Sequence, residues 1–196
     1  MGKIFYLLGK SGSGKDSIYK ELMDMGLGLK PVVLYTTRPM RDGEKEGIEY
    51  HFIDDEEFER LRDADKLIEY REYNTVCGIW RYMTVDDGQI DISRNSFLMI
   101  GTLESYEKML THFEKDALCP IYLTVDDGER LMRALARERQ QSSPKYAELC
   151  RRYLADEKDF SPERLAECHI DRSFKNDDFK RCLNEIADYI RSLRHA

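Results

Sequence analysis

The sequence predicts an α/β fold, a three-layer domain in which helices cover both faces of a mostly parallel sheet. Three observations support this prediction. Short, continuously apolar runs recur along the chain, which is typical of strands buried on both faces of a parallel sheet. Segments with apolar residues at helical spacing alternate with these runs, and such alternation favours a three-layer arrangement. The length of 196 residues allows one sizeable core with a small appended lobe.

The chain opens with one strand, one loop and one helix. Residues 3–8 (KIFYLL) predict a buried strand, and a glycine-rich loop follows it directly. A helix is expected over 17–25, because apolar residues recur there at helical spacing and Gly26 and Gly28 end the segment. Residues 31–36 (PVVLYT) predict a second strand. The next 60 residues or so are polar and interrupted, with few long periodic runs.

Strands and helices alternate through the rest of the chain. Three further strands are expected, at 96–101 (SFLMIG), 119–125 (CPIYLTV) and 169–174 (HIDRSF). Four helices are expected, at 103–113, 126–140, 145–160 and 176–194, with a turn-rich break (QSSP) at 141–144. Either Asp126 or Asp127 suits the N-cap of the second of these helices, because its carboxylate can accept a backbone N–H bond.

The composition argues against several classes of partner and location. The formal net charge of −7 disfavours duplex nucleic acid or an anionic membrane as the main partner, since both favour a basic surface. No apolar run approaches the roughly 20 residues that a membrane span needs, and the apolar stretch at the start is too short for a signal peptide. The cysteines are odd in number and lack zinc-ligand spacing, so we expect free thiols in a reducing cytoplasm. They are Cys77, Cys119, Cys150, Cys168 and Cys182.

The stretch GKSGSGK, residues 9–15, has the spacing of a phosphate-binding loop. Gly9, Gly14 and Lys15 meet the pattern G-x-x-x-x-G-K between a strand and a helix, and this context makes the pattern specific. Glycines let backbone N–H groups turn towards a phosphate, the helix N-terminus adds partial positive charge, and the lysine reaches the β- and γ-phosphates. The residues expected to bind the nucleotide are Gly9, Lys10, Ser11, Gly12, Ser13, Gly14, Lys15, Asp16 and Ser17.

Asp16 occupies the place where such loops usually carry a serine or threonine that holds Mg²⁺. A carboxylate is a better ligand for a hard cation than a hydroxyl, so Asp16 is expected to hold the metal directly or through water. Ser17 lies about 100° further round the helix and suits the α-phosphate instead. The loop is therefore expected to bind ATP and Mg²⁺ with an altered metal shell.

A second phosphate site is indicated by the stretch YTTRPMRDGEKEGIEYHF, residues 35–52. Arg38 and Arg41 offer planar guanidinium groups that match phosphate oxygens, and Tyr50 adds a hydroxyl donor. By itself this pattern is weak, because an exposed basic turn would use the same residue types.

Together with later segments, this stretch resembles the guanylate kinase family. The family's TTR-x-x-R-x-GE-x-x-G-x-x-Y-x-F segment is matched here by Thr36, Thr37, Arg38, Arg41, Gly43, Glu44, Gly47, Tyr50 and Phe52. The family's Ile-Glu pair is similar to Ile68-Glu69, and its V-N-D-D run is similar to residues 175–178, which include Asn176. Its arginine-bearing lid is similar to the segments that carry Arg133, Arg137 and Arg152. The resemblance therefore spans nearly the whole chain.

The resemblance implies a P-loop NTPase-type fold with a small lobe that binds a nucleoside monophosphate and a short lid. The core domain would comprise residues 1–35 and 93–196, with the lid at approximately 137–148. The monophosphate-binding lobe would comprise residues 36–92.

The resemblance also implies an ATP-dependent phosphotransferase that moves the γ-phosphate of ATP to GMP or dGMP and yields GDP and ADP. Glu69 would read the amino and ring N–H groups of guanine, and Asn176 would contact adenine. The acceptor would be bound by Arg38, Arg41, Glu44, Tyr50 and Glu69. The positive charge that offsets the transferring phosphoryl group would come from Lys15, Arg38, Arg133, Arg137 and Arg152.

Three departures from the family pattern concern the acceptor. Leu34 stands where the family has a serine, Met99 and Gly101 stand where it has an acidic pair, and Cys77-Gly78-Ile79 stands where it has Y-G-[ST]. These changes remove hydrogen-bond partners for a guanine ring. The Lys-Asp-Ser end of the loop is also similar to that of ribose bisphosphate phosphokinases. Two alternatives therefore stay open: a kinase of another phosphorylated acceptor such as ribose bisphosphate, and a non-catalytic guanylate-kinase-like interaction module.

Overall fold

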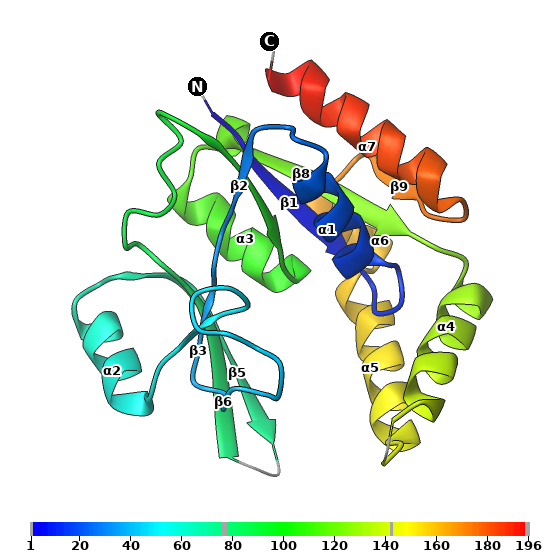
Figure 1. Ribbon diagram of the computed structural model, residues 1–196, viewed down its shortest axis with the longest axis horizontal. Coiled ribbons are helices and arrows are strands. Elements are labelled where there is room, and N and C mark those ends of the chain that lie inside the picture. The colour runs from blue at the N-terminus through cyan, green and yellow to red at the C-terminus, as the bar shows by residue number, and fades with distance from the viewer. Residues whose placement is uncertain (1, 76–77, 142, 195–196) are drawn as a thin grey trace.

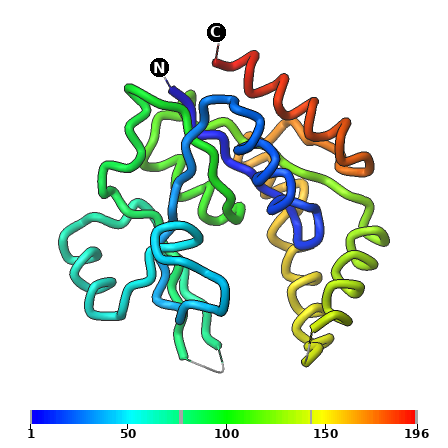
Figure 2. Tube along the Cα trace, in the orientation of Figure 1, coloured from blue at the N-terminus to red at the C-terminus, as the bar shows by residue number. Residues whose placement is uncertain are grey.

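A computed structural model describes residues 2–75, 78–141 and 143–194, so Cys77 and position 142 of the predicted lid lie outside the described residues. The central sheet is wholly parallel, with the strand order β2-β7-β1-β8-β9 (Figure 1). Its strands are β1 (Ile4–Gly9), β2 (Leu29–Pro31), β7 (Ser96–Ile100), β8 (Leu118–Thr124) and β9 (Ser173–Lys175). Both chain termini lie at the same end of this core (Figure 2).

Helices cover both faces of the sheet, which confirms the predicted three-layer α/β fold. Successive residues of a strand point to opposite faces, and β1 is buried throughout. Tyr6 packs in one core cluster with apolar side chains of α3, whereas Phe5 packs in a second cluster with α1 and α7. The helices around the sheet are α1 (Lys15–Asp24), α3 (Leu103–His112), α6 (Pro162–Glu167) and α7 (Phe179–Arg194), and a short 3-10 turn (Lys115–Ala117) precedes β8.

A separate lobe is built on a second sheet with the strand order β4-β3-β6-β5. Phe58 and Met83 form the centre of a small core cluster of its own. The lobe consists of β3 (Tyr35–Thr36), β4 (His51–Phe52), α2 (Asp55–Asp63), β5 (Leu67–Thr75) and β6 (Gly78–Val85). These elements lie close to the predicted lobe at 36–92. The division of the chain at those residues stays a prediction.

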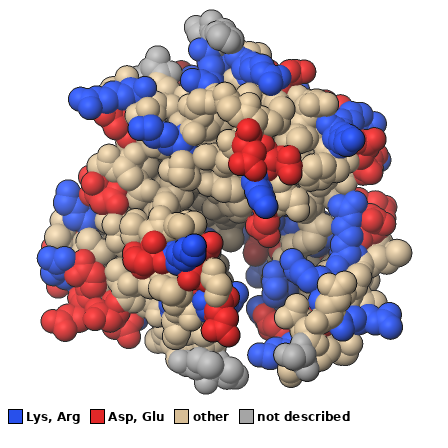
Figure 3. Space-filling view, viewed as in Figure 1, with Lys and Arg blue, Asp and Glu red and all other residues tan. Residues whose placement is uncertain are grey.

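A helical hairpin faces this lobe across the molecule. It consists of α4 (Asp127–Arg139) and α5 (Tyr146–Asp159), and its tip coincides with the predicted lid. Asp126, not Asp127, is the N-cap of α4, because its side chain accepts the Glu129 N–H bond. The lobe and the hairpin project from the same side of the core (Figure 1). The molecular surface is hollowed between them, with Lys and Arg side chains gathered on the hairpin side (Figure 3).

Several element predictions need correction. Residues 31–36 do not form one strand: Pro31 ends β2 in the core sheet, and β3 starts at Tyr35 in the lobe sheet. The last strand is shorter than the predicted 169–174 and begins at Ser173, where it pairs with β8. Helix α6 was not predicted; Ser161 caps its start and Pro162 occupies its first turn.

Two expectations about the chain's chemistry can be compared with the described residues. Four of the five cysteines are free thiols, as predicted, and the fifth, Cys77, is outside the described part. Within residues 2–75, 78–141 and 143–194, no helix combines the length and apolarity that crossing a membrane requires.

Candidate functional site

The phosphate loop connects β1 to α1, and close approaches of neighbouring atoms explain its glycines. Gly12 and Gly14 have φ angles of 84° and 90°, which side chains disfavour. A Cβ atom on Gly14 would lie 2.6 Å from Asn176 Nδ2, and one on Gly12 would lie 2.9 Å from the Arg130 carbonyl oxygen. Gly14 is also the N-cap of α1 and supplies no side-chain acceptor. The N–H groups of the first helical turn are therefore suited to bind an anion.

Lys15 folds back over this loop. Its Nζ atom donates hydrogen bonds to the carbonyl oxygens of Gly9, at 2.5 Å, and Lys10, at 3.2 Å. Burial lowers the pKa of Lys15 below its ordinary value, while the nearby carboxylates of Asp16 and Asp156 act in the opposite direction. The amino group thus lies in a partly desolvated place, where its charge acts strongly on a bound phosphate.

The loop forms one wall of a cavity of about 610 Å³. The other lining residues come from the helical hairpin and from the segment that links β9 to α7. The cavity brings together residues that are far apart in the sequence, namely Lys15, Asp16, Ser17, Arg133, Arg137, Arg152 and Asn176. The predicted loop, lid and Asn176 segments therefore meet at one place. The roles of the individual residues stay predictions.

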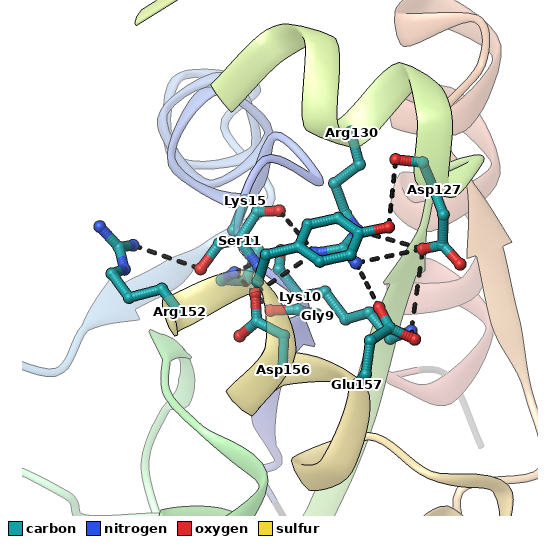
Figure 4. A network of polar contacts seen from close by, with 10 residues as sticks. Gly9, Lys10, Ser11, Lys15, Asp127, Arg130, Arg152, Asp156 and Glu157 are labelled. Carbon is teal, nitrogen blue, oxygen red and sulfur yellow. Dashed lines mark hydrogen bonds and ion pairs between the residues drawn. The ribbon is translucent and has the colours of Figure 1, made fainter. Parts of the chain in front are cut away.

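Hydrogen bonds connect the three segments around the cavity. Asn176 is buried, and its side-chain N–H group donates to the carbonyl oxygen of Ser13 at 2.8 Å. Arg133 donates to the carbonyl oxygen of Asn176 at 3.4 Å. Arg152 donates to the hydroxyl of Ser11 at 3.2 Å (Figure 4). Asn176 thus supports the phosphate loop, a contact that the sequence did not reveal.

The second predicted phosphate site lies in the lobe. Arg38 is only 3% exposed, and its guanidinium group forms two hydrogen bonds with Glu44, at 2.8 and 2.9 Å. The same guanidinium group lies 5.3 Å from the centre of the Tyr50 ring. The backbone N–H of Arg41 also donates to Glu44, at 2.8 Å. Four predicted acceptor-binding residues therefore lie together, and Glu44 holds the guanidinium group of Arg38 and the backbone of Arg41.

The Arg38–Glu44 pair leads to a prediction about acid stability. Hydrogen bonding to Arg38 lowers the pKa of Glu44 to about 2, below its usual value in an unfolded chain of about 4.3. Because the pKa of Glu44 is lower in the folded state than in the unfolded state, its carboxylate stabilises the fold at pH values above the unfolded-state pKa. This stabilisation is lost as the pH falls towards 2. We therefore expect Glu44→Gln to flatten the fall in unfolding free energy between about pH 4.5 and pH 2. Urea unfolding at several pH values measures this slope, with Glu21→Gln on exposed α1 surface as control; equal slopes in all variants would contradict the prediction.

Glu69 lies on β5 and is completely covered, with 0% side-chain exposure. Arg71 Nε donates to its carboxylate at 3.1 Å, and the Thr84 hydroxyl donates to it at 2.8 Å. Arg71 was not singled out from the sequence. Its position two residues after Glu69 on a strand was the available signal, because that spacing places both side chains on one face. Whether Glu69 reads a base stays a prediction.

The residues that depart from the family pattern are accommodated by packing. Met99 is buried in the core, and Leu34 packs against the same cluster. Gly101 adjoins the ring of Tyr6, since a Cβ atom there would lie 2.1 Å from the Tyr6 hydroxyl oxygen. That hydroxyl forms a hydrogen bond with Ser105 at 2.7 Å. Ile79 is 47% exposed on β6. Apolar or aromatic groups therefore adjoin Leu34, Met99 and Gly101, whereas Ile79 lies at the surface.

A cluster of charged side chains beside the phosphate loop was also not predicted. It centres on Arg130, which is 1% exposed, and contains Asp156 and Glu157 of α5 (Figure 4). In the described part of the chain, no group of three His, Cys, Asp or Glu side chains has an arrangement that could hold a metal ion. Asp16 and Ser17 line the cavity beside the loop and are exposed.

Known proteins resemble this chain in sequence and in fold. Guanylate kinases of Bordetella pertussis and Mesorhizobium japonicum are 44% identical over 71 residues and 43% identical over 76 residues. These segments are 36% and 39% of this chain and 33% and 35% of the relatives, so the match spans about a third of those proteins. The crystal structure of guanylate kinase from Anaplasma phagocytophilum has the same fold, with a TM-score of 0.66 at 21% identity. That comparison covers 97% of this chain and 85% of the other.

The family can be assigned from the whole chain rather than from one motif. A family model described as guanylate kinase matches residues 1–193, from before the phosphate loop to the last turn of α7. The match includes the lobe, the helical hairpin and both walls of the cavity. The chain therefore belongs to the guanylate kinase family.

Proposed function

We propose that this protein is a nucleoside monophosphate kinase that transfers the γ-phosphoryl group of ATP to GMP or dGMP and releases ADP and GDP or dGDP. The observation that carries the proposal is a cavity that joins a phosphate loop with arginines of the hairpin, opposite a lobe with a buried arginine. Membership of the guanylate kinase family and the names of the relatives support this acceptor class.

The chemistry requires alignment and positive charge more than covalent participation by the protein. An oxygen of the acceptor phosphate attacks the γ-phosphorus, and the bond from this phosphorus to the β–γ bridging oxygen breaks. In our proposal Lys15, Arg133, Arg137 and Arg152 offset the charge of the transferring group. Arg38, Arg41 and Tyr50 hold the acceptor phosphate, and Glu44 fixes the guanidinium group of Arg38.

The residues around the loop fit ATP with Mg²⁺. Mg²⁺ in phosphate-transfer sites is usually held by one or two protein oxygen ligands together with phosphates and water. Asp16 and Ser17 supply a carboxylate and a hydroxyl at the cavity, and the N-terminus of α1 supplies backbone N–H groups for phosphate. The bound ion would neutralise phosphate charge. Asp16 would be its protein ligand.

The cavity of about 610 Å³ is within the volume range of small-molecule sites, which supports a small-molecule nucleotide substrate. A net charge of −7 does not favour nucleic acid or anionic membrane as a partner. We propose that the enzyme acts in the cytoplasm.

An ADP-release assay with a panel of acceptors tests the proposed function. The purified protein is given ATP and Mg²⁺ with GMP, dGMP, AMP, UMP, CMP or ribose bisphosphate, and each rate is compared with the rate without acceptor. We expect GMP or dGMP to give the highest rate. Release only with ribose bisphosphate would overturn the nucleotide assignment, and the absence of release with every acceptor would favour an interaction module.

A further inference from the structure

A charged cluster joins the phosphate loop to the base of the helical hairpin (Figure 4). We call it the loop clamp, and its members are Lys10, Asp127, Arg130, Asp156 and Glu157. Arg130 Nη1 donates to the Ser11 carbonyl oxygen at 3.2 Å and to Asp156 at 3.3 Å. Its Nη2 atom donates to Asp127 at 3.1 Å and also to Glu157. Lys10 Nζ donates to Glu157 at 2.6 Å.

The centre of the loop clamp is withdrawn from water. Arg130 is 1% exposed, and its guanidinium group lies 4.2 Å from the centre of the Tyr153 ring. Lys10 and Asp156 each have 17% side-chain exposure. Separating these partners would leave a buried charge without a counter-charge, which costs free energy. The ion pairs are therefore expected to keep their geometry. Asp127 and Glu157 are more exposed, at 55% and 38%, so the buried part of the loop clamp consists of Arg130, Lys10 and Asp156.

Asp156 connects the loop backbone to the hairpin. Its carboxylate accepts the Ser11 N–H bond at 2.7 Å as well as the bond from Arg130. Arg152 lies one helical turn earlier on α5, so both side chains are on the same face of that helix. Arg152 contacts the Ser11 hydroxyl and lines the nucleotide cavity. Asp156 and Arg152 thus both bind Ser11, one at its backbone N–H and the other at its hydroxyl.

We propose that Asp156 is a positioning residue for phosphoryl transfer. Together with Arg130 it holds Ser11 and thereby the part of the phosphate loop around Ser11. Through α5 it also places Arg152 at the cavity. Asp156 is not among the residues that line the cavity, so we assign it no direct contact with substrate. This inference rests on the proposed function for its effect on turnover, but its effect on ATP binding does not depend on which acceptor is used.

The simple electrostatic expectation for Asp156 has the opposite sign. A carboxylate near a triphosphate repels it, so removing the carboxylate would tighten ATP binding if charge alone mattered. If the main role of Asp156 is to position the loop, removing its carboxylate loosens the loop and weakens ATP binding. The reason is that a smaller fraction of the protein molecules then has the loop in its binding conformation. The two readings can therefore be separated by the direction of one measured change.

The experiment compares Asp156→Ala and Asp156→Asn with wild type and with Asp159→Asn, an exposed acid on the same helix. The dissociation constant of a fluorescent ATP analogue is measured without acceptor, and kcat and KM are measured with GMP. We expect Asp156→Ala to weaken ATP binding about 10-fold and to lower kcat about 10- to 100-fold, with little change in KM for GMP. Asp156→Asn keeps an oxygen that can accept the Ser11 N–H bond, so its defect should be smaller. Asp159→Asn should match wild type.

Tighter or unchanged ATP binding in Asp156→Ala, together with unchanged kcat, would overturn the proposal. Thermal unfolding identifies the folded fraction, and Asp156→Asn serves as the informative variant if the alanine variant folds poorly. A second readout is the double variant with Arg152→Ala: its loss in kcat should be clearly smaller than the product of the two single losses, because Asp156 acts partly through Arg152. If wild type itself releases no ADP with any acceptor, the proposed function fails, and the ATP-binding measurement alone decides the role of Asp156.

Discussion

Replacement of Lys15 by methionine is expected to lower the rate of phosphoryl transfer by about 10³-fold. Methionine keeps most of the length of the side chain and removes its charge. The amino group of Lys15 lies at the cavity and is partly desolvated, so its charge acts on phosphate oxygens with little screening by water. The loss should appear mainly in kcat, since the cationic group stabilises charge that develops during transfer.

The measurement is ADP release with GMP under saturating ATP, supported by thermal unfolding of each variant. Lys20→Met is the matched control, because Lys20 lies on the exposed face of the same helix. We expect the control to keep wild-type activity. A Lys15→Met variant that folds normally and keeps more than about a tenth of the activity would contradict a phosphate-binding role for this lysine.

The largest expected effect on stability follows from replacing Arg71 by methionine. This change leaves the carboxylate of Glu69 buried without its cationic partner, and breaking a buried pair in this way typically costs about 3–5 kcal/mol. Glu69 has 0% side-chain exposure, so water cannot replace the guanidinium group without rearrangement of the lobe. A loss of this size is a large part of the total stability of a domain, which is about 5–15 kcal/mol.

Urea unfolding measures this loss, and two further variants show its cause. The double variant Arg71→Met with Glu69→Gln removes both charges and should recover a large part of the stability. Arg60→Met breaks an exposed ion pair with Glu57 and should leave the unfolding free energy close to the wild-type value. A cost below about 1 kcal/mol for Arg71→Met would contradict the prediction that Arg71 is needed to pair the buried Glu69 carboxylate.

The sequence was informative where function depends on neighbouring residues. The phosphate loop could be predicted because its glycines, Lys15 and the helix start lie within one short segment after an apolar strand. The four-residue spacing of Arg133 and Arg137 likewise predicts a shared helix face, and both residues line the cavity. These features arise from local backbone geometry.

Other features depend on contacts between distant segments. The burial of Arg38 against Glu44 could not be distinguished from an exposed basic turn, because the burial depends on how the lobe packs around it. Asn176 is expected from the family resemblance to contact adenine. Its side chain also donates a hydrogen bond to the carbonyl oxygen of Ser13, which lies 163 positions earlier in the chain. No pattern near either residue specifies that contact.

From the amino-acid sequence one can predict the alternation of strands and helices in the core, the position of the phosphate loop, and the residue types available for binding phosphate. The division of residues 31–36 between two sheets, the pairing of Arg71 with Glu69, and the connection of the loop to the hairpin by Arg130 and Asp156 are visible only in the folded chain. The physical reason is that hydrophobic periodicity and backbone propensity act over a few residues. The partner of a buried charge depends instead on the packing of the whole chain, because packing brings together side chains that are far apart in the sequence.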